Sequence, residues 1–246
     1  EAAERCFVEA ETWDQAATAA DERAQMLTAP REQAELLAIV AFYLVRAGDE
    51  SSALVKLEQA TQLDPNNDEY AAQLEKSHEA AGRTEDRVQF LLKRAELLDD
   101  PAKRRQLRKR ASEIQRDVLG DVDAARESLN LALADGDDVE VLTLLADDAE
   151  KREEAQDAVE FLGRLARLLP DPGMRVGVMM REAQILADML DEPATAIERY
   201  ETILKEYQPN NLDALRTIAE LYERLDNPEG VADALERQLT ALEDGE

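Results

Sequence analysis

Apolar residues between positions 34 and 67 recur every three or four places, the interval at which residues return to one face of an α-helix. Two such stripes are separated by Gly48-Asp49, and Pro65 ends the second. The first stripe consists of Leu37, Val40, Ala41 and Leu44, and the second of Ala53, Leu57 and Ala60. Because small residues alternate with large ones across the two stripes, two helices can approach closely, and the segment predicts an antiparallel helical hairpin.

The same pair of stripes returns along the whole chain. The Ala or Val that begins the second stripe occurs at positions 16, 53, 88, 125, 158, 196 and 231. These intervals of about 33 to 38 residues are typical of a helical repeat, and about seven repeats fill the chain. The repeats are predicted at 1–28, 34–67, 68–100, 102–135, 138–169, 173–208 and 212–245. Proline and glycine fall almost only between the stripes, and no useful length alternates with period two, so strands are not expected.

The pattern predicts an all-α fold, a right-handed α-solenoid of antiparallel helical hairpins that forms a single domain over 1–246. The first helix of the repeat at 1–28 starts within its pattern, so we expect the sequence to be a fragment of a longer chain. Ends that lack capping helices would expose apolar faces, and we expect them to allow self-association.

One repeat, at 68–100, departs from the pattern. Two arginines, Arg87 and Arg94, fall where the other hairpins have small buried residues. Because a guanidinium group is rarely buried unless it is paired, we expect the second helix to shift by one residue. That shift brings Val88 onto its buried face.

The hairpin at 34–67, with its Gly-Asp turn and closing Asp-Pro, resembles a tetratricopeptide repeat, whose period is about 34 residues. The resemblance spans the chain and is strongest at 34–67 and 212–245. Such arrays usually bind an extended peptide or a helix in a groove lined by the first helix of each hairpin. By that analogy the groove would be lined by Phe42, Lys76, Arg105, Arg108, Met180, Arg216 and Glu220. No Lys is followed four residues later by Asn, so the subclass that clamps the C-terminal carboxylates of chaperones is not expected.

The sequence offers little material for catalysis, and we expect no catalytic residue, metal site or cofactor. The chain has one histidine, His78, and one cysteine, Cys6, far apart in sequence. We interpret His78 as a packing residue and Cys6 as a small buried apolar group rather than a reactive thiol. The acidic run at 135–138 lacks the alternating ligands of a calcium loop, so we interpret it as a polar turn with helix-capping aspartates.

The charge is strongly negative, with 29 basic and 56 acidic residues and a formal net charge of −27. This field disfavours nucleic acids and anionic membranes as partners, and no stretch approaches the roughly 20 apolar residues that span a bilayer. The acidity is open to three interpretations: a solubility surface, adaptation to salt, or recruitment of a basic partner. A single cysteine excludes an intramolecular disulfide, so we expect a cytoplasmic location.

Positive charge is concentrated in one predicted helix, 103–116, which holds seven basic residues. Its cations either pair with carboxylates on adjacent helices or dock an acidic partner, in which case Lys109 would join Arg105 and Arg108 at the contact. A second local feature is a group of methionines at 174, 179, 180 and 189. Methionine fills irregular cores and also serves adaptable binding surfaces, and both interpretations stay open.

Taken together, these features predict a non-enzymatic scaffold or adaptor that binds a peptide or another protein. Helical arrays expose a long surface, which suits binding more than catalysis. The alternative is a regulatory or sensor arm of a larger protein, whose groove would hold a segment of its own chain.

Overall fold

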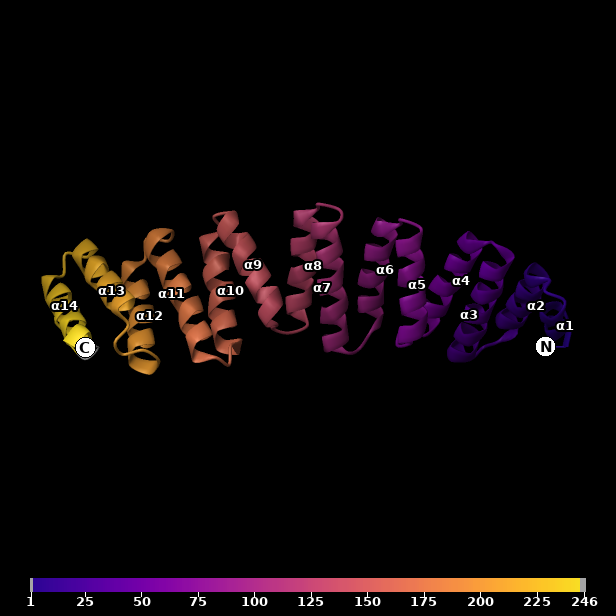
Figure 1. Cartoon of the computed structure of the whole chain (residues 1–246), viewed down its shortest axis with the longest axis horizontal. Coiled ribbons are helices and arrows are strands. Elements are labelled where there is room, and N and C mark those ends of the chain that lie inside the picture. Colours follow the sequence, from indigo (N-terminus) through magenta and orange to yellow (C-terminus); the bar gives the residue numbers. More distant parts are fainter. Residues whose placement is uncertain (1, 244–246) are drawn as a thin grey trace. The chain divides into compact units, whose positions relative to one another are not determined.

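The computed structural model describes residues 2–243, and this part of the chain contains 14 helices and no strand (Figure 1). The first eight helices are α1 (Ala2–Glu9), α2 (Trp13–Met26), α3 (Pro30–Ala47), α4 (Glu50–Leu63), α5 (Asp68–Ala80), α6 (Thr84–Leu97), α7 (Pro101–Asp117) and α8 (Val122–Ala134). The remaining six are α9 (Val139–Lys151), α10 (Ala155–Leu168), α11 (Pro172–Asp188), α12 (Pro193–Glu206), α13 (Leu212–Arg224) and α14 (Pro228–Glu243). Consecutive helices pack against one another as hairpins, which confirms the predicted all-α helical-repeat fold.

The helices fall into two compact units, residues 1–135 with α1 to α8 and residues 136–246 with α9 to α14. We call these unit 1 and unit 2. The described helices form four pairs in unit 1 and three in unit 2, as expected for about seven repeats. The sequence predicts a single domain over 1–246, and that statement stays a prediction.

The turn inside every helix pair contains one residue in the left-handed backbone conformation. These residues are Glu11, Gly48, Gly82, Gly120, Glu153, Asp191 and Asp226, each with a positive φ. At Gly48, for example, φ is 86°, and the following amide, of Asp49, donates to the carbonyl of Leu44 at 2.9 Å. This geometry closes the end of α3 because a glycine accepts a positive φ without steric cost. The turn therefore repeats at the backbone level even where the sequence does not supply a glycine.

Acidic or amide residues begin many of the helices by capping free backbone N–H groups. Asn67 accepts hydrogen bonds from the amides of Glu69 and Tyr70 at the start of α5. Asp138 caps α9 in the same way, so the acidic run at 135–138 contains a capping aspartate, as predicted. Pro30, Pro101 and Pro172 lie in the first turns of α3, α7 and α11, where a missing N–H costs nothing.

The core consists of alanine and branched aliphatic side chains that meet between helices. Six of the seven positions that mark the repeat are buried, namely Ala16, Ala53, Val88, Ala125, Ala158 and Ala196. In the third hairpin, Val88 and Ala95 are buried, so the predicted one-residue shift is confirmed. Arg94 lies beside them and is nearly buried, with its Nε donating to the carbonyl of Pro65 at 3.0 Å. The guanidinium of Arg94 therefore has a backbone partner, the carbonyl of Pro65, and a side-chain partner, the carboxylate of Asp68.

The prediction that Cys6 is buried is wrong, because its side chain is exposed. The buried face of α1 is marked by Glu4, whose carboxylate binds Arg23 on α2 and accepts from Tyr43 Oη at 3.3 Å. Cys6 is two residues along the helix and therefore points to a different side.

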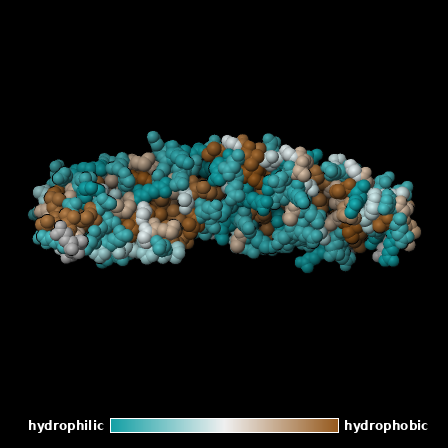
Figure 2. Space-filling model, in the orientation of Figure 1, coloured by the Kyte–Doolittle hydropathy of each residue, from teal (hydrophilic) through white to brown (hydrophobic). Residues whose placement is uncertain are grey.

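Exposed apolar side chains gather on α14. Leu235, Leu239 and Leu242 each expose about half or more of their surface, and apolar atoms are visible over this helix in the space-filling view (Figure 2). Self-association through such a face stays a prediction.

Candidate functional site

The one histidine lies in the core. His78 exposes 1 % of its surface, and its ring centroid lies 6.3 Å from that of Phe90. Burial lowers the pKa of His78 below its usual value, although the nearby Glu58 carboxylate acts in the opposite direction. His78 is therefore a packing residue, as predicted.

Neither a metal-binding cluster nor a membrane-spanning helix is found within residues 2–243. No three His, Cys, Asp or Glu side chains there are grouped so that they could hold a metal ion. None of the helices in this range is both long and apolar enough to cross a membrane.

Open clefts are a regular feature of each unit. Because successive helices are antiparallel, a helix and the next but one run parallel and leave a cleft above the helix between them. Such clefts lie between α4 and α6, between α5 and α7, between α10 and α12, and between α11 and α13.

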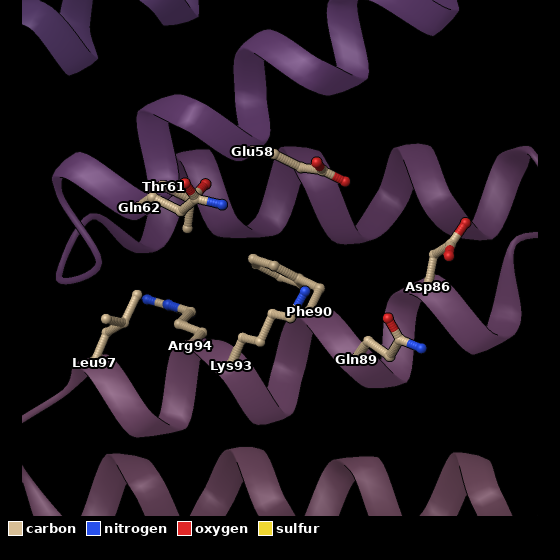
Figure 3. A pocket seen from close by; sticks show the side chains of 9 residues that line it. All are labelled: Glu58, Thr61, Gln62, Asp86, Gln89, Phe90, Lys93, Arg94 and Leu97. Atoms are coloured by element: carbon tan, nitrogen blue, oxygen red, sulfur yellow. The ribbon is translucent and has the colours of Figure 1, made fainter.

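The cleft between α4 and α6 has apolar groups within a polar rim (Figure 3). It encloses about 90 Å³. Its lining residues are Glu58, Thr61, Gln62, Asp86, Gln89, Phe90, Lys93, Arg94 and Leu97. Phe90 is half-buried and also packs against the cores on both sides of α6. Leu97 leaves 50 % of its surface exposed. Such partly exposed apolar groups can accept an apolar side chain of a ligand.

Basic and acidic side chains occupy different parts of this cleft. In Figure 3, Arg94 and Leu97 lie at one end, Phe90 and Lys93 lie in the middle, and Asp86 lies at the other end. Glu58 reaches in from α4 above Phe90. Arg94 is already bound to Pro65 and Asp68. Glu58 is half-buried with 45 % of its side chain exposed, and Asp86 is exposed.

His78 supports this cleft from the helix beneath it, α5. Its Nε2 lies 3.8 Å from a carboxylate oxygen of Glu58, and neither ring nitrogen has a hydrogen-bond partner within the described residues. The imidazole therefore packs beside two residues of the cleft, Phe90 and Glu58, without lining the cleft itself.

The basic helix α7 uses most of its cations within unit 1. Arg104 and Arg108 both bind the carboxylate of Asp135, whose side chain is only 4 % exposed. Arg105 donates to the backbone carbonyl of the same residue at 3.2 Å. On another side of the helix, Lys103 pairs with Asp68 at 3.1 Å and Arg110 pairs with Glu75 at 2.8 Å. These contacts match one of the two alternatives left open by the sequence, in which the cations of the basic helix pair with carboxylates on adjacent helices. Docking of an acidic partner here stays a prediction, as does a role for the half-buried Lys109.

The other residues predicted to line a binding groove lie in separate places. Phe42 is exposed, and its ring is stacked by the guanidinium of Arg46 at 5.3 Å. Lys76 is exposed on α5. Arg216 pairs with Asp213 one turn away, at 2.5 Å.

Met180 and Glu220 are two predicted groove residues that share one cleft. Both line the cleft between α11 and α13, which encloses about 470 Å³. Of the four methionines singled out in the sequence, Met179 is buried, Met174 and Met189 are exposed, and Met180 is half-buried. The group thus serves both core and surface.

The sequence analysis did not identify the α4–α6 cleft. A signal was present, because Phe90 and Leu97 are apolar residues of α6 that lie off the buried stripe of Val88, Leu91 and Ala95. An apolar residue beside such a stripe is exposed unless another element covers it.

No protein-family model matches the chain, and no curated protein is similar to it. Among solved structures, it is similar to MamA MSR-1 C2, with 24% identity, coverage of 72% of this chain and 97% of that chain, and a TM-score of 0.41. It is also similar to PilF of Pseudomonas aeruginosa, with 16% identity over 88% of this chain and 94% of that one, at a TM-score of 0.39.

A third similar structure is the TPR domain of P58(IPK), with 17% identity, coverage of 100% of this chain and 59% of that chain, and a TM-score of 0.32. Likeness at these scores carries no argument about function. The seven helix pairs and their regular turns characterise this chain as a TPR-like helical-repeat protein.

Proposed function

We propose that this protein is a non-enzymatic interaction scaffold that binds a peptide segment of a partner in the α4–α6 cleft. The observation that carries the proposal is Leu97, half-exposed at the end of a cleft whose middle holds Phe90. A partner that covers these side chains removes apolar surface from water, at roughly 25 cal/mol per Å². Peptide grooves in helical proteins commonly combine such anchors with charged rims.

The rim of the cleft favours a particular peptide composition. An apolar side chain would lie on Phe90 and Leu97, and a Lys or Arg of the peptide would lie beside Glu58 and Asp86. Lys93 forms no ion pair with a described residue and could meet a carboxylate of the peptide. We therefore infer a ligand with a basic residue next to an apolar one.

The charge of the whole chain supports a basic partner. With a formal net charge of −27, the chain attracts positively charged molecules and repels acidic ones. Complementary charge mainly raises the rate of encounter and the specificity of binding. Of the three interpretations of the acidity, recruitment of a basic partner is the one that matches the carboxylates on the rim of the cleft.

The experiment that tests the proposal selects a phage-displayed random dodecapeptide library on the full chain. We expect enriched peptides to contain a large apolar residue within a few positions of Lys or Arg. The neutral variant Glu58→Gln/Asp86→Asn should retain fewer of the basic peptides. Enrichment of sequences without basic residues, or no enrichment, would contradict the proposal.

A matched control separates the local carboxylates from the charge of the whole chain. Glu22→Gln/Glu32→Gln makes the same change in net charge at two exposed residues of unit 1 that do not line the cleft. This control should select the same peptides as the unmodified chain. If both double variants lose the basic peptides equally, the attraction comes from the overall field and not from the cleft.

A further inference from the structure

A second cleft, in unit 2, gathers positive charge in this acidic chain. It lies above α11 between α10 and α12 and encloses about 370 Å³. Arg167, Arg175 and Arg199 line it, one from each of the three helices. Among the described residues that line it, Glu182 is the one carboxylate. Three guanidinium groups beside one carboxylate leave a local excess of positive charge.

Arg175 is held in place by neutral partners. Its Nε donates to the carbonyl of Leu169 at 3.2 Å, and its Nη1 donates to Tyr207 Oη at 3.1 Å. The guanidinium also lies over the Tyr207 ring, 5.6 Å from its centroid. These contacts tie the end of α10 to the end of α12 through α11. They fix the position of Arg175 without neutralising its charge.

Glu182 sets the floor of the cleft. It is 2 % exposed, and its carboxylate binds Arg199 at 3.0 Å. Gly163, in the middle of α10, lies beside it, and a Cβ there would be in ordinary van der Waals contact with Glu182 Oε1, at 3.4 Å.

The surroundings of Glu182 act on its pKa in two opposite directions. Burial raises the pKa of its carboxyl, although Arg199 and Arg167 act in the opposite direction.

Arg167 is the most available of the three cations. It is exposed, and it makes no ion pair or hydrogen bond with a described residue. The α11–α13 cleft of the same unit is different, because there Arg181 pairs with Asp147 and Glu150 at 2.6 and 2.5 Å. Arg224 in that cleft pairs with Asp191 at 3.0 Å.

We propose that the pocket formed by Arg167, Arg175 and Arg199 binds an oxyanion group, a carboxylate or a phosphate. Guanidinium groups match both anions because their planar fork can donate two parallel hydrogen bonds. Tyr207 adds a hydroxyl, and the side chains of Ala166 and Met179 provide an apolar wall for the group that carries the anion. This pocket shares no residue with the α4–α6 cleft, so either proposal can fail without the other.

The test uses the full chain labelled with ¹⁵N-glycine, which gives nine amide signals at most. Gly163 lines the arginine pocket and Gly177 lines the α11–α13 cleft, so the two amides report on the two clefts of one unit. Their signals are assigned by their loss in Gly163→Ala and Gly177→Ala. Sodium phosphate and sodium acetate are titrated separately, with sodium chloride at equal ionic strength as reference.

We expect a saturable shift of the Gly163 signal and little shift of Gly177. Saturation with phosphate alone assigns the pocket to phosphate groups, and saturation with acetate alone assigns it to carboxylates. If Gly163 responds to both anions, the pocket is a general oxyanion site. If Gly163 does not move, or moves no more than in sodium chloride, the proposal is overturned.

Variants of one exposed cation each make the test specific. Arg167→Ala removes an exposed guanidinium that makes no ion pair or hydrogen bond with a described residue, and we expect about a tenfold weaker saturation at Gly163. Lys205→Ala removes one exposed positive charge from the same unit outside the pocket and should leave the titration unchanged. Equal weakening by both variants would show a non-specific charge effect and overturn the proposal.

Discussion

Arg108 on α7 donates to the carboxylate of Asp135 at the end of α8, and this carboxylate is almost fully buried, with 4 % of the side chain exposed. Arg104 binds the second oxygen of the same group at 2.6 Å. A basic helix that looks like a docking surface in the sequence is thus partly an internal support for one buried carboxylate. The two ion pairs with Asp135 therefore stabilise the fourth hairpin, which consists of α7 and α8.

This relationship predicts that Arg108→Ala lowers the free energy of unfolding by about 2 kcal/mol, because it leaves a buried carboxylate with fewer partners. The control is Arg110→Ala, since Arg110 has 52 % of its side chain exposed and its partner, Glu75, keeps a second ion pair with Arg87 at 2.7 Å. That variant should cost about 0.5 kcal/mol or less. Urea unfolding followed by circular dichroism measures both, and equal losses would contradict the role given to Asp135.

The left-handed residue in each hairpin turn predicts a stabilising substitution. Glu153 has a φ of 60°, in the turn where the hairpin at 34–67 has Gly48. Because a residue with a Cβ is strained there by roughly 1–2 kcal/mol, Glu153→Gly should stabilise the protein by about 0.5–1 kcal/mol after the entropy of glycine is counted.

The reverse change, Gly48→Ala, should destabilise by about 1 kcal/mol. Thermal unfolding of the two variants measures both effects. Shifts of the same sign would show that the two turns are not equivalent.

A close approach between α13 and α14 predicts a further difference between two glycines. A Cβ on Gly230 would lie 2.6 Å from the ring of Tyr222, so Gly230→Ala forces a shift of the ring or of the helix. We expect a loss of about 1–3 kcal/mol. Gly177 is also helical but has no atom within 4 Å of the Cβ position, so Gly177→Ala should stabilise by about 0.5–1 kcal/mol. Denaturant midpoints of the two alanine variants distinguish these outcomes, and midpoints that move together would refute the close approach.

The buried carboxyl of Glu182 predicts a pH dependence of stability. Its pKa is raised in the folded state, because burial penalises the charged form. The stabilising contribution of the neutral form is therefore complete below the pKa of the unfolded chain and is lost as the pH rises through the folded value. Glu182→Gln keeps the shape but cannot ionise, so the stability of the variant relative to the unmodified chain should increase between about pH 4 and pH 7.

The measurement is the difference in free energy of unfolding between the two proteins across that range, since contributions of other titrating groups cancel in the difference. A difference that stays constant with pH would mean that Glu182 does not titrate in this window. A difference that falls with rising pH would mean that its folded pKa is lowered.

Much of the fold could be predicted from the sequence because the information is local. The alternation of small and large residues within one hairpin, such as Ala53 and Leu57, defines both the helix face and the distance to its neighbour. The shift at Val88 was predictable for the same reason, since Arg87 and Arg94 could not both be buried without partners.

The functional surfaces were less predictable because they combine residues from several helices. Asp135 lies at the end of α8, and nothing in its neighbourhood in the sequence shows that it faces Arg104 and Arg108. The arginine pocket likewise depends on α10, α11 and α12, whose contributions are separated by eight residues or more and fall on different faces. Cys6 could not be placed because the buried residue of its short helix is an acidic one, Glu4, so the apolar residues of α1 do not mark its buried side.

The central claim, that the α4–α6 cleft binds a peptide through its apolar groups, is tested most directly by the affinity of a selected dodecapeptide. Fluorescence anisotropy of the labelled peptide is measured with the unmodified chain, with Leu97→Ser and with Leu131→Ser. Leu131 is a matched control because it is 43 % exposed on α8 of the same unit and does not line the cleft. We predict binding about tenfold weaker for Leu97→Ser and unchanged for Leu131→Ser. Equal affinities for all three proteins would contradict the claim.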